Sequence, residues 1–442
     1  MGNSSEQLSA EEIKSAGNTR SNLENSDLKS VLERQTRNRK LLMVLAFFAL
    51  SLNLRAPITS LPPIIQELRT VFQINAGVAG FLTSIPVLCF GLLTPIAGFL
   101  MKNVRLESTV FFTLAGIAVG AVVRASGGLG AAIAGTVLIG ISLTVGNISG
   151  LMILAREFPQ RLSFFTGLYV SGMSWGSMGT MSLTAPMAQA MGWRTALAAP
   201  ALLALAAIFL WMGVLFFDKR KTNTLEQLHM QDKSKAETIA NSEPKTKPAR
   251  SSSVNRRPLV WILSVAFAAH TFMFYGFTAW MPVYLKQSLQ MSEATAGVAS
   301  SLFQILGLLG CFGLPFLVST KRFSPRALFL VVTMSWLAMV IGFAIIPSLW
   351  IIWVIFGGIS SGGGFTVIFS MIMNSAKNLD ENRSMSTVVQ TAGYIIASIS
   401  PFALGHLHEI SGNWQSSMEM LFAASVVMIC CGLVATSAKC SS

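Results

Sequence analysis

Charged residues are scarce in this chain of 442 residues, and their scarcity excludes a soluble globular protein. Asp, Glu, Lys and Arg together make up 12% of the sequence, against about 25% in soluble domains. Hydrophobic residues make up 52%, and the mean hydropathy is +0.60. So few charges cannot cover the surface of a large soluble protein, and the composition therefore predicts a membrane protein with many spans.

The chain also lacks the motifs of redox, metal-dependent and nucleotide-hydrolysing proteins. Its five cysteines show no CxxC pair and no Cys/His metal-ligand spacing, so we expect no metal site and no cofactor. The glycines of Gly357-Gly358 and Gly362-Gly-Gly364 lack the lysine of a phosphate-binding loop. Because no nucleophile triad is visible either, we expect neither an enzyme nor an ATP-driven pump.

Twelve apolar runs are long enough to cross a bilayer as helices. Their approximate limits are 40–60, 75–100, 107–125, 130–155, 162–187, 194–217, 258–282, 293–319, 325–346, 349–374, 385–407 and 414–437.

Two polar stretches lie outside these runs. Residues 1–39 mix acidic with basic residues, which is unlike a cleavable signal peptide and predicts a disordered tail. Residues 218–257 are rich in Lys, Glu, Ser and Thr and predict a flexible linker. The linker separates an N-terminal half at 40–217 from a C-terminal half at 258–438.

The distribution of Lys and Arg predicts the orientation in the membrane. Of the 32 basic residues, 27 lie in the tails, the linker and alternate loops, and Arg55 lies within the first run. The other side holds only Arg69, Arg124, Arg194 and Lys286. We expect the chain to lie in the cytoplasmic membrane, and the positive-inside rule then places both termini in the cytoplasm. The net charge of +13 follows from this pattern, and we expect no nucleic-acid partner.

Short motifs recur between the two halves at a nearly constant distance. The pairs are Pro62 and Pro282, Ala76-Gly-Val-Ala79 and Ala296-Gly-Val-Ala299, Pro95 and Pro315, and Trp193 and Trp414. A constant offset argues against chance matches in apolar sequence. An even number of spans separates the copies, so the two halves have the same orientation. We therefore predict an all-α membrane protein with twelve transmembrane helices in two parallel six-helix repeats, the major facilitator fold.

Arg55 is the most informative single residue. If the first helix enters the bilayer near Leu41, the arginine lies about 21 Å deep in a hydrocarbon layer of roughly 30 Å. A cation at that depth needs a partner or a wet cavity. Ser51, Arg55 and Thr59 fall on one face of a continuous helix, so we predict a site for an anion or a polar substrate. The alternative is an arginine that snorkels outward or forms a structural ion pair.

Other candidate substrate-binding residues lie on helices that would line the central path. They are Thr59, Asn147, Tyr169, His270, Tyr275, Gln390 and Tyr394. Asn147 could instead form a hydrogen bond that holds two neighbouring helices together. His270 could carry a coupling proton or be a buried, hydrogen-bonded histidine. Ser386, Gln390, Tyr394 and Ser398 follow one another at helical spacing and form a polar stripe.

Carboxylates are absent from the middle of the predicted central helices. Glu67, Glu157, Glu293 and Glu409 lie near the ends of spans. A cationic substrate would need a buried acid, and a carboxylate proton relay is missing as well. A buried arginine without a buried acid favours an anion or a neutral polar molecule.

Several motifs resemble the cyanate porter group of the major facilitator superfamily, the CynX/NimT type. They are Leu54-Arg55 with Thr59, Ala79-Gly-Phe-Leu-Thr-Ser-Ile-Pro86, Gly146-Asn147, Arg156-Glu-Phe-Pro159, Thr166-Gly-Leu-Tyr169, Gly192-Trp-Arg-Thr-Ala196, Phe274-Tyr275, Ala279-Trp-Met-Pro282, Gln390 with Gly393-Tyr394, and Gly405-His-Leu-His-Glu409. The resemblance implies transport of cyanate or a 2-nitroimidazole-like molecule.

The sequence thus predicts a secondary active transporter that moves a small anion or polar heterocycle by alternating access. A multidrug exporter of the same fold is the main alternative, since the 29 Phe and 22 Met would suit an adaptable apolar cavity. A non-transporting membrane sensor is the alternative from another class. The expected partners of the predicted transporter are a small-molecule substrate, the lipid bilayer and, if His270 carries it, a coupling proton.

Overall fold

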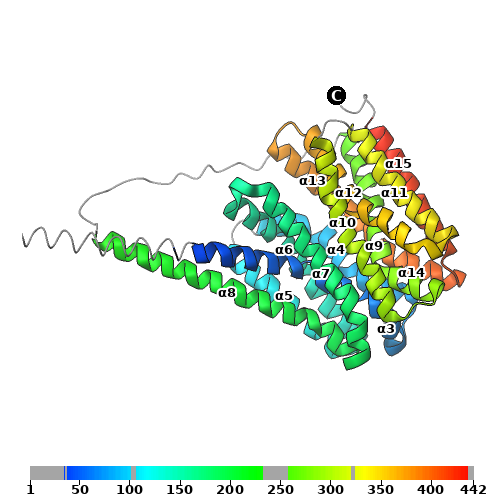
Figure 1. The fold of residues 1–442 in the computed structure, drawn as a ribbon, viewed down its shortest axis with the longest axis horizontal. Coiled ribbons are helices and arrows are strands. Elements are labelled where there is room, and N and C mark those ends of the chain that lie inside the picture. The colour runs from blue at the N-terminus through cyan, green and yellow to red at the C-terminus, as the bar shows by residue number, and fades with distance from the viewer. Residues whose placement is uncertain (1–33, 35–36, 101–105, 232–256, 320–323, 437–442) are drawn as a thin grey trace, which may run out of the picture. The chain divides into compact units, whose positions relative to one another are not determined.

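Every regular element is helical in the part of the chain that the computed structural model describes, which is residues 34, 37–100, 106–231, 257–319 and 324–436. The first helix covers residues 37–53. The others are α2 Ala56–Thr59, η1 Pro62–Ile64, α3 Ile65–Phe72, α4 Ala76–Leu100, α5 Leu106–Ser126, α6 Leu129–Glu157, η3 Pro159–Arg161, α7 Leu162–Met191, α8 Trp193–Gln231, α9 Pro258–Leu289, α10 Glu293–Ser319, α11 Pro325–Ile345, η5 Pro347–Leu349, α12 Trp350–Ser375, α13 Leu379–Ala397, α14 Ile399–Ser411 and α15 Gln415–Ala435 (Figure 1).

Eleven helical stretches among the described residues are long and apolar enough to cross a membrane. α7 has 30 residues, so it is also long enough, but its many serines and threonines make it more polar than the others. Together with α7, these stretches confirm the all-α fold of twelve spans.

Most of the predicted tail at 1–39 and of the predicted linker at 218–257 lies outside the described residues. α8 continues to Gln231, past the limit of 217 that we predict for the sixth span. Its last turns contain Lys, Leu, Glu, Gln and Met, which all favour helix.

The chain forms two compact units. One comprises residues 1–47 with 209–244, and the other comprises 48–208 with 245–442. In the first unit, Leu42 packs against Gly213. All candidate site residues belong to the second unit.

Two sets of helix contacts join the N-terminal and C-terminal halves within the second unit. α4 packs against α13 and α14, and α7 packs against α10. The first contact is very close, since a Cβ added at Gly80 would lie 2.1 Å from the main-chain oxygen of Pro401. The repeated Ala-Gly-Val-Ala motif lies in the first turns of both α4 and α10, so the two sets of contacts are equivalent in the repeat.

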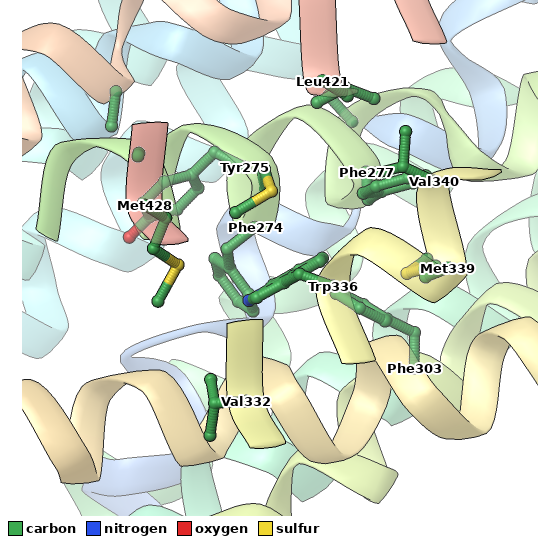
Figure 2. Close-up of a cluster of buried hydrophobic side chains, with 14 of the residues drawn as sticks. Phe274, Tyr275, Phe277, Phe303, Val332, Trp336, Met339, Val340, Leu421 and Met428 are labelled. Atoms are coloured by element: carbon green, nitrogen blue, oxygen red, sulfur yellow. The ribbon is translucent and has the colours of Figure 1, made fainter. Parts of the chain in front are cut away.

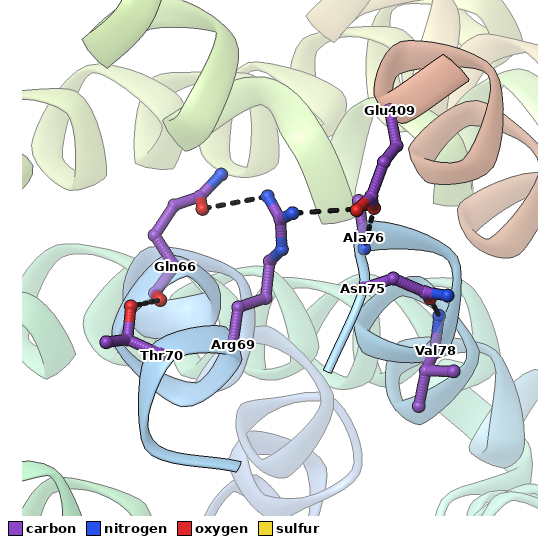
Figure 3. Close-up of polar contacts among 7 residues, drawn as sticks. All are labelled: Gln66, Arg69, Thr70, Asn75, Ala76, Val78 and Glu409. Atoms are coloured by element: carbon purple, nitrogen blue, oxygen red, sulfur yellow. Dashed lines mark hydrogen bonds and ion pairs between the residues drawn. The ribbon is translucent and has the colours of Figure 1, made fainter. Parts of the chain in front are cut away.

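A polar contact also joins the halves (Figure 3). Arg69 on α3 donates to Gln66 at 3.0 Å and forms an ion pair of 3.4 Å with Glu409 on α14. Glu409 also accepts the backbone N–H of Ala76, the first residue of α4. Because α4 begins at Ala76, this N–H has no acceptor within the helix, and the carboxylate provides one. The negative charge of the carboxylate also lies at the positive end of the helix dipole, which is favourable.

α9 is the centre of the C-terminal half. Most of its residues between Leu263 and Leu285 are buried, which is typical of a helix with neighbours on all sides. Figure 2 shows aromatic rings of α9, α10 and α11 packed together, with Phe277 and Trp336 stacked at a centroid distance of 6.0 Å. In lipid such packing, rather than escape from water, holds helices together.

The first span is not the continuous helix over 40–60 that the sequence predicts. The helix ends at Asn53, Leu54 and Arg55 form a turn, and α2 begins at Ala56. Pro57 explains the break, because it has no N–H for the carbonyl of Asn53 and its ring clashes with that carbonyl. The expectation that Ser51, Arg55 and Thr59 share one face of an unbroken helix was therefore wrong.

The eleventh span is broken as well. We predict one helix over 385–407, but α13 ends at Ala397 and α14 begins at Ile399. Pro401 cannot donate to the carbonyl of Ala397, which favours a break of the helix at this point. The carbonyl of Pro401 accepts the indole N–H of Trp280 at 2.7 Å, which ties the break to α9.

Candidate functional site

A cavity of about 150 Å³ lies between the two halves. It is lined by the break that carries Arg55 and by helices α7, α9, α10 and α12. The lining residues are Arg55, Val170, Met173, Ser174, Ser177, Phe274, Gln304, Gly307, Cys311, Ser361, Gly362 and Phe365. One cation and no carboxylate lie in this set.

A larger cavity of about 560 Å³ is a weaker candidate for the transport site. It lies among residues of α9, α11 and α15 within the C-terminal half, and no predicted site residue lines it. A site for alternating access must contact both halves, and only the smaller of these two cavities does so.

Arg55 provides the positive charge of the smaller cavity. It is half-buried, and its guanidinium lies 5.0 Å from the centroid of the Phe274 ring, a cation–π contact. It forms no ion pair with any carboxylate in the described part of the chain. The structure thus favours an arginine that faces the cavity over one held in a structural ion pair.

Three of the four tyrosines in the sequence lie within electrostatic range of this arginine. The charge of Arg55 acts on the hydroxyls of Tyr169, Tyr275 and Tyr394. The rings of Tyr275 and Tyr394 lie 6.4 Å apart, although they come from α9 and α13. The three phenol groups are hydrogen-bond donors near the cavity, but none of the three tyrosines is among its lining residues.

Tyr169 and Tyr275 differ in what their hydroxyls already bind. Tyr169 donates to Oδ1 of Asn147 at 3.3 Å, and its ring packs on Gly150, where a Cβ would lie 2.8 Å from it. Tyr275 is 3% exposed, and its hydroxyl has no partner among the described groups. A buried hydroxyl without a partner is rare in a folded protein. Tyr275 therefore has a free donor near Arg55, whereas the donor of Tyr169 is occupied.

Asn147 supports Tyr169 and does not line the cavity. Its Nδ2 donates to the carbonyl of Leu143 at 3.0 Å, and its Oδ1 accepts from Tyr169. This arrangement is the helix-to-helix contact that the sequence left as the alternative. Thr59 is similar, since it is 2% exposed and shares a hydrogen bond of 2.8 Å with Thr180.

His270 lies inside the C-terminal half and is 0% exposed. Its Nδ1 accepts the indole N–H of Trp336 at 3.1 Å, which assigns the proton of the neutral ring to Nε2. Gly364 allows this placement, because a Cβ there would lie 2.3 Å from the imidazole ring. His270 does not line the cavity.

The polar stripe on α13 is present in part. Tyr394 contacts the rings of Phe90 and Phe267, with centroids 5.7 and 5.3 Å away. Gln390 lies one turn earlier and is half-buried, and it is not among the cavity-lining residues. The break at Ser398 ends the stripe.

Gln304 on α10 is a site residue that the sequence patterns did not single out. It is 6% exposed, lines the cavity, and donates its Nε2 to Thr278 at 3.1 Å. Its amide oxygen remains available as an acceptor. A long amide inside an apolar run was the signal that could have found it. Ser174, Ser177 and Ser361 add hydroxyls to the same lining.

The carboxylates near span ends have partners away from the cavity. Arg156 pairs with Glu107 at 2.7 Å and with Glu157 at 3.0 Å, and Lys286 pairs with Glu293 at 2.5 Å. These contacts leave the charge of Arg55 unbalanced within the described residues. The cavity can attract an anion or bind a neutral molecule with acceptor atoms, and it disfavours a cation.

Comparison with known proteins gives a family and several relatives. The family model described as Major Facilitator Superfamily matches residues 41–401. A Bacillus subtilis protein described as an uncharacterized transporter, YycB, is 28% identical over 87% of this chain and 91% of its own. In Escherichia coli, the 2-nitroimidazole transporter is 23% identical over 90% and 95% of the two chains. The cyanate transport protein CynX is 26% identical over 87% and 94%.

Solved structures support the same fold. The nucleoside transporter NupG has a TM-score of 0.71 at 11% identity, covering 89% of this chain and all of that one. A bacterial homologue of the lysosomal transporter Spinster has a TM-score of 0.66 at 14% identity, covering 90% and 97%. At these identities the likeness concerns the fold alone.

Proposed function

Because the chain belongs to the major facilitator superfamily, and is thus a multi-pass membrane transporter rather than an enzyme, we propose that it carries a small anion or small polar heterocycle. Cyanate and 2-nitroimidazole are the two chemical models for this substrate. The observation that carries the proposal is the unpaired Arg55 in a cavity between the halves whose lining has no carboxylate.

The size of the cavity supports a small substrate. Sites for drug-sized ligands usually measure about 300–1,000 Å³. The cavity around Arg55 has about 150 Å³, which suits a molecule of a few heavy atoms better than a bulky drug. The multidrug exporter that the sequence left open therefore has less support.

The relatives support the same chemical class. Two of them are named for cyanate, an anion, and for 2-nitroimidazole, a polar heterocycle with acceptor oxygens. Both could accept hydrogen bonds from a guanidinium and from the hydroxyl of Tyr275. We propose that Arg55 holds the negative or acceptor end, with Gln304 of the cavity lining as a hydrogen-bonding partner and Phe274 as a stacking surface. Tyr275, which lies beside Phe274 but outside the lining, would be a second hydrogen-bond donor.

Alternating access would follow from movement of one half against the other. The contacts of α4 with α13 and α14, together with the pair of Arg69 and Glu409, would close one side of the site. The basic residues predict that both termini lie in the cytoplasm. In that orientation, the side closed by these contacts faces the outside of the cell. Opening the site to the outside would require these contacts to separate.

The first test is thermal stabilisation of the purified protein by cyanate, by 2-nitroimidazole and by a panel of bulky drugs. A ligand at one hundred times its Kd stabilises the folded state by about 2.7 kcal/mol. We expect stabilisation by at least one of the two small probes, and its loss in Arg55→Ala. Arg194→Ala is the control, because Arg194 is exposed and its guanidinium stacks on the ring of Trp193, away from the cavity.

Each other outcome has a definite meaning. Stabilisation by bulky drugs alone, unchanged in Arg55→Ala, would support the exporter. Equal stabilisation of the wild type and Arg55→Ala by cyanate would refute the role of Arg55. A stable cytoplasmic partner together with no flux of any probe in proteoliposomes would support the non-transporting sensor.

A further inference from the structure

Arg124, near the end of α5, is a second buried arginine. The sequence places it on the outer side with three other basic residues, but its side chain is 0% exposed. Its Nη1 donates to the carbonyl of Pro57 at 2.8 Å. Its Nη2 donates to Oγ of Ser60 at 2.9 Å and to the carbonyl of Leu197 on α8 at 3.2 Å. It pairs with no carboxylate in the described ranges.

The acceptors of Arg124 lie in the broken segment that follows Arg55. α2 has four residues, and Pro62 and Pro63 follow it without N–H groups. The carbonyls at the end of α2 therefore cannot all find helical partners, which is costly within a membrane. Arg124 donates to the carbonyl of Pro57 and to Oγ of Ser60, on either side of the carbonyls of Ile58 and Thr59 that these prolines leave without helical donors, and so holds the chain where helical hydrogen bonds are missing.

The guanidinium holds both ends of α2 at once. Pro57 is two residues after Arg55, and Ser60 directly follows α2. The bond to Leu197 ties the same guanidinium to α8, so three chain segments meet at one side chain. The hydroxyl of Ser60 also donates to the carbonyl of Pro57 at 3.0 Å, which closes the arrangement.

We infer that Arg124 is a positioning residue that holds the broken segment and thereby orients Arg55 toward the substrate. The inference rests on the proposed function for its effect on substrate, but not for its effect on the segment. An error of about 1 Å in the placement of a binding group can cost roughly a hundredfold in activity. A lysine could not replace Arg124 fully, because one ammonium lacks the planar fork that reaches acceptors on two segments.

The test uses Arg124→Gln, Arg124→Lys and the control Arg194→Gln in the full-length purified protein. Hydrogen–deuterium exchange without ligand reports the order of residues 54–61. Thermal shift titrations with cyanate and with 2-nitroimidazole report the affinity. We expect faster exchange confined to residues 54–61 and at least a tenfold loss of affinity in Arg124→Gln. Arg124→Lys should fall between this variant and the wild type, and Arg194→Gln should match the wild type.

Three results would overturn the inference. Unchanged exchange in residues 54–61 would show that Arg124 does not hold the segment. Faster exchange throughout α5 and α8 as well would show a general structural role. Faster local exchange with unchanged affinity would show that Arg55 does not depend on it. If Arg124→Gln does not fold, Ser60→Ala removes one acceptor only, and the same local exchange should rise by a smaller factor.

The two proposals can fail separately. If the wild type binds neither probe, the proposed function fails, whereas the exchange data still decide whether Arg124 holds the broken segment. If the wild type binds cyanate and Arg124→Gln shows unchanged exchange and affinity, the positioning role fails and the proposed function stands.

Discussion

Replacing Tyr275 by phenylalanine should separate binding from stability. Its hydroxyl is buried and has no partner among the described groups, yet it lies within the field of Arg55. Tyr169 offers a matched control on α7, because its hydroxyl lies near the same arginine but donates to Asn147 at 3.3 Å. Tyr275→Phe and Tyr169→Phe remove the same atom from two different environments.

The two variants should change stability in opposite directions. A buried polar group without a partner costs about 1–3 kcal/mol, so Tyr275→Phe should stabilise the protein without ligand by about 1 kcal/mol. Tyr169→Phe loses a hydrogen bond and leaves Oδ1 of Asn147 unpaired, so it should destabilise by about 0.5–1.5 kcal/mol. If Tyr275 donates to a bound anion, Tyr275→Phe should weaken binding by about 1.5–3 kcal/mol, the usual value for a bond to a charged group.

The assay is thermal unfolding of both variants in detergent, with and without cyanate. We expect Tyr275→Phe to raise the Tm of the ligand-free protein by on the order of 1 °C and to lose most of the stabilisation by ligand. Tyr169→Phe should lower the Tm. A lower Tm in ligand-free Tyr275→Phe, similar to that of Tyr169→Phe, would show that the hydroxyl has a structural partner and would refute the reasoning.

Two further predictions concern the packing of the halves and the buried histidine. Gly80→Ala should abolish folding or transport, because its Cβ would lie 2.1 Å from the carbonyl of Pro401, whereas Gly179→Ala should be neutral because its Cβ would have open space. Flux measurements and Tm values test both, and an active, stable Gly80→Ala would contradict the close contact of α4 with α14. His270→Gln keeps an acceptor for Trp336 but cannot carry a proton at neutral pH. If a proton couples to transport through His270, a pH gradient should no longer drive probe accumulation in proteoliposomes that contain His270→Gln, although exchange of the probe across the membrane continues. Accumulation that is still driven by the pH gradient in this variant would show that His270 has a structural role only.

The sequence alone determined the fold class and the likeness of the two halves. Hydropathy identifies membrane spans because the bilayer demands long apolar helices, whatever their tertiary contacts. The constant offset between Ala76-Gly-Val-Ala79 and Ala296-Gly-Val-Ala299 indicated the repeat, and these motifs lie in the first turns of α4 and α10 in the structure. Arg55 was also recognisable from sequence, since a cation in an apolar run is costly unless it faces a cavity or a partner.

Helix breaks were visible as prolines, but their consequences were not. Pro57 and Pro401 lie in runs that hydropathy reads as single spans. Whether a proline bends a helix or ends it depends on the groups that satisfy the freed carbonyls. Near the first break Arg124 donates to the carbonyl of Pro57, and near the second Trp280 donates to the carbonyl of Pro401; both donors come from distant helices.

Only the tertiary structure decided which polar residues meet. Helical spacing treated Asn147, Tyr275 and His270 alike, because each is a polar residue in an apolar run. In the structure Asn147 supports Tyr169, His270 binds Trp336, and Tyr275 keeps a free hydroxyl near Arg55. Periodicity along one helix cannot tell which neighbour a side chain faces, since partners come from other helices through packing. The sequence therefore determined the spans and the buried charge, whereas tertiary packing decided which side chains surround it.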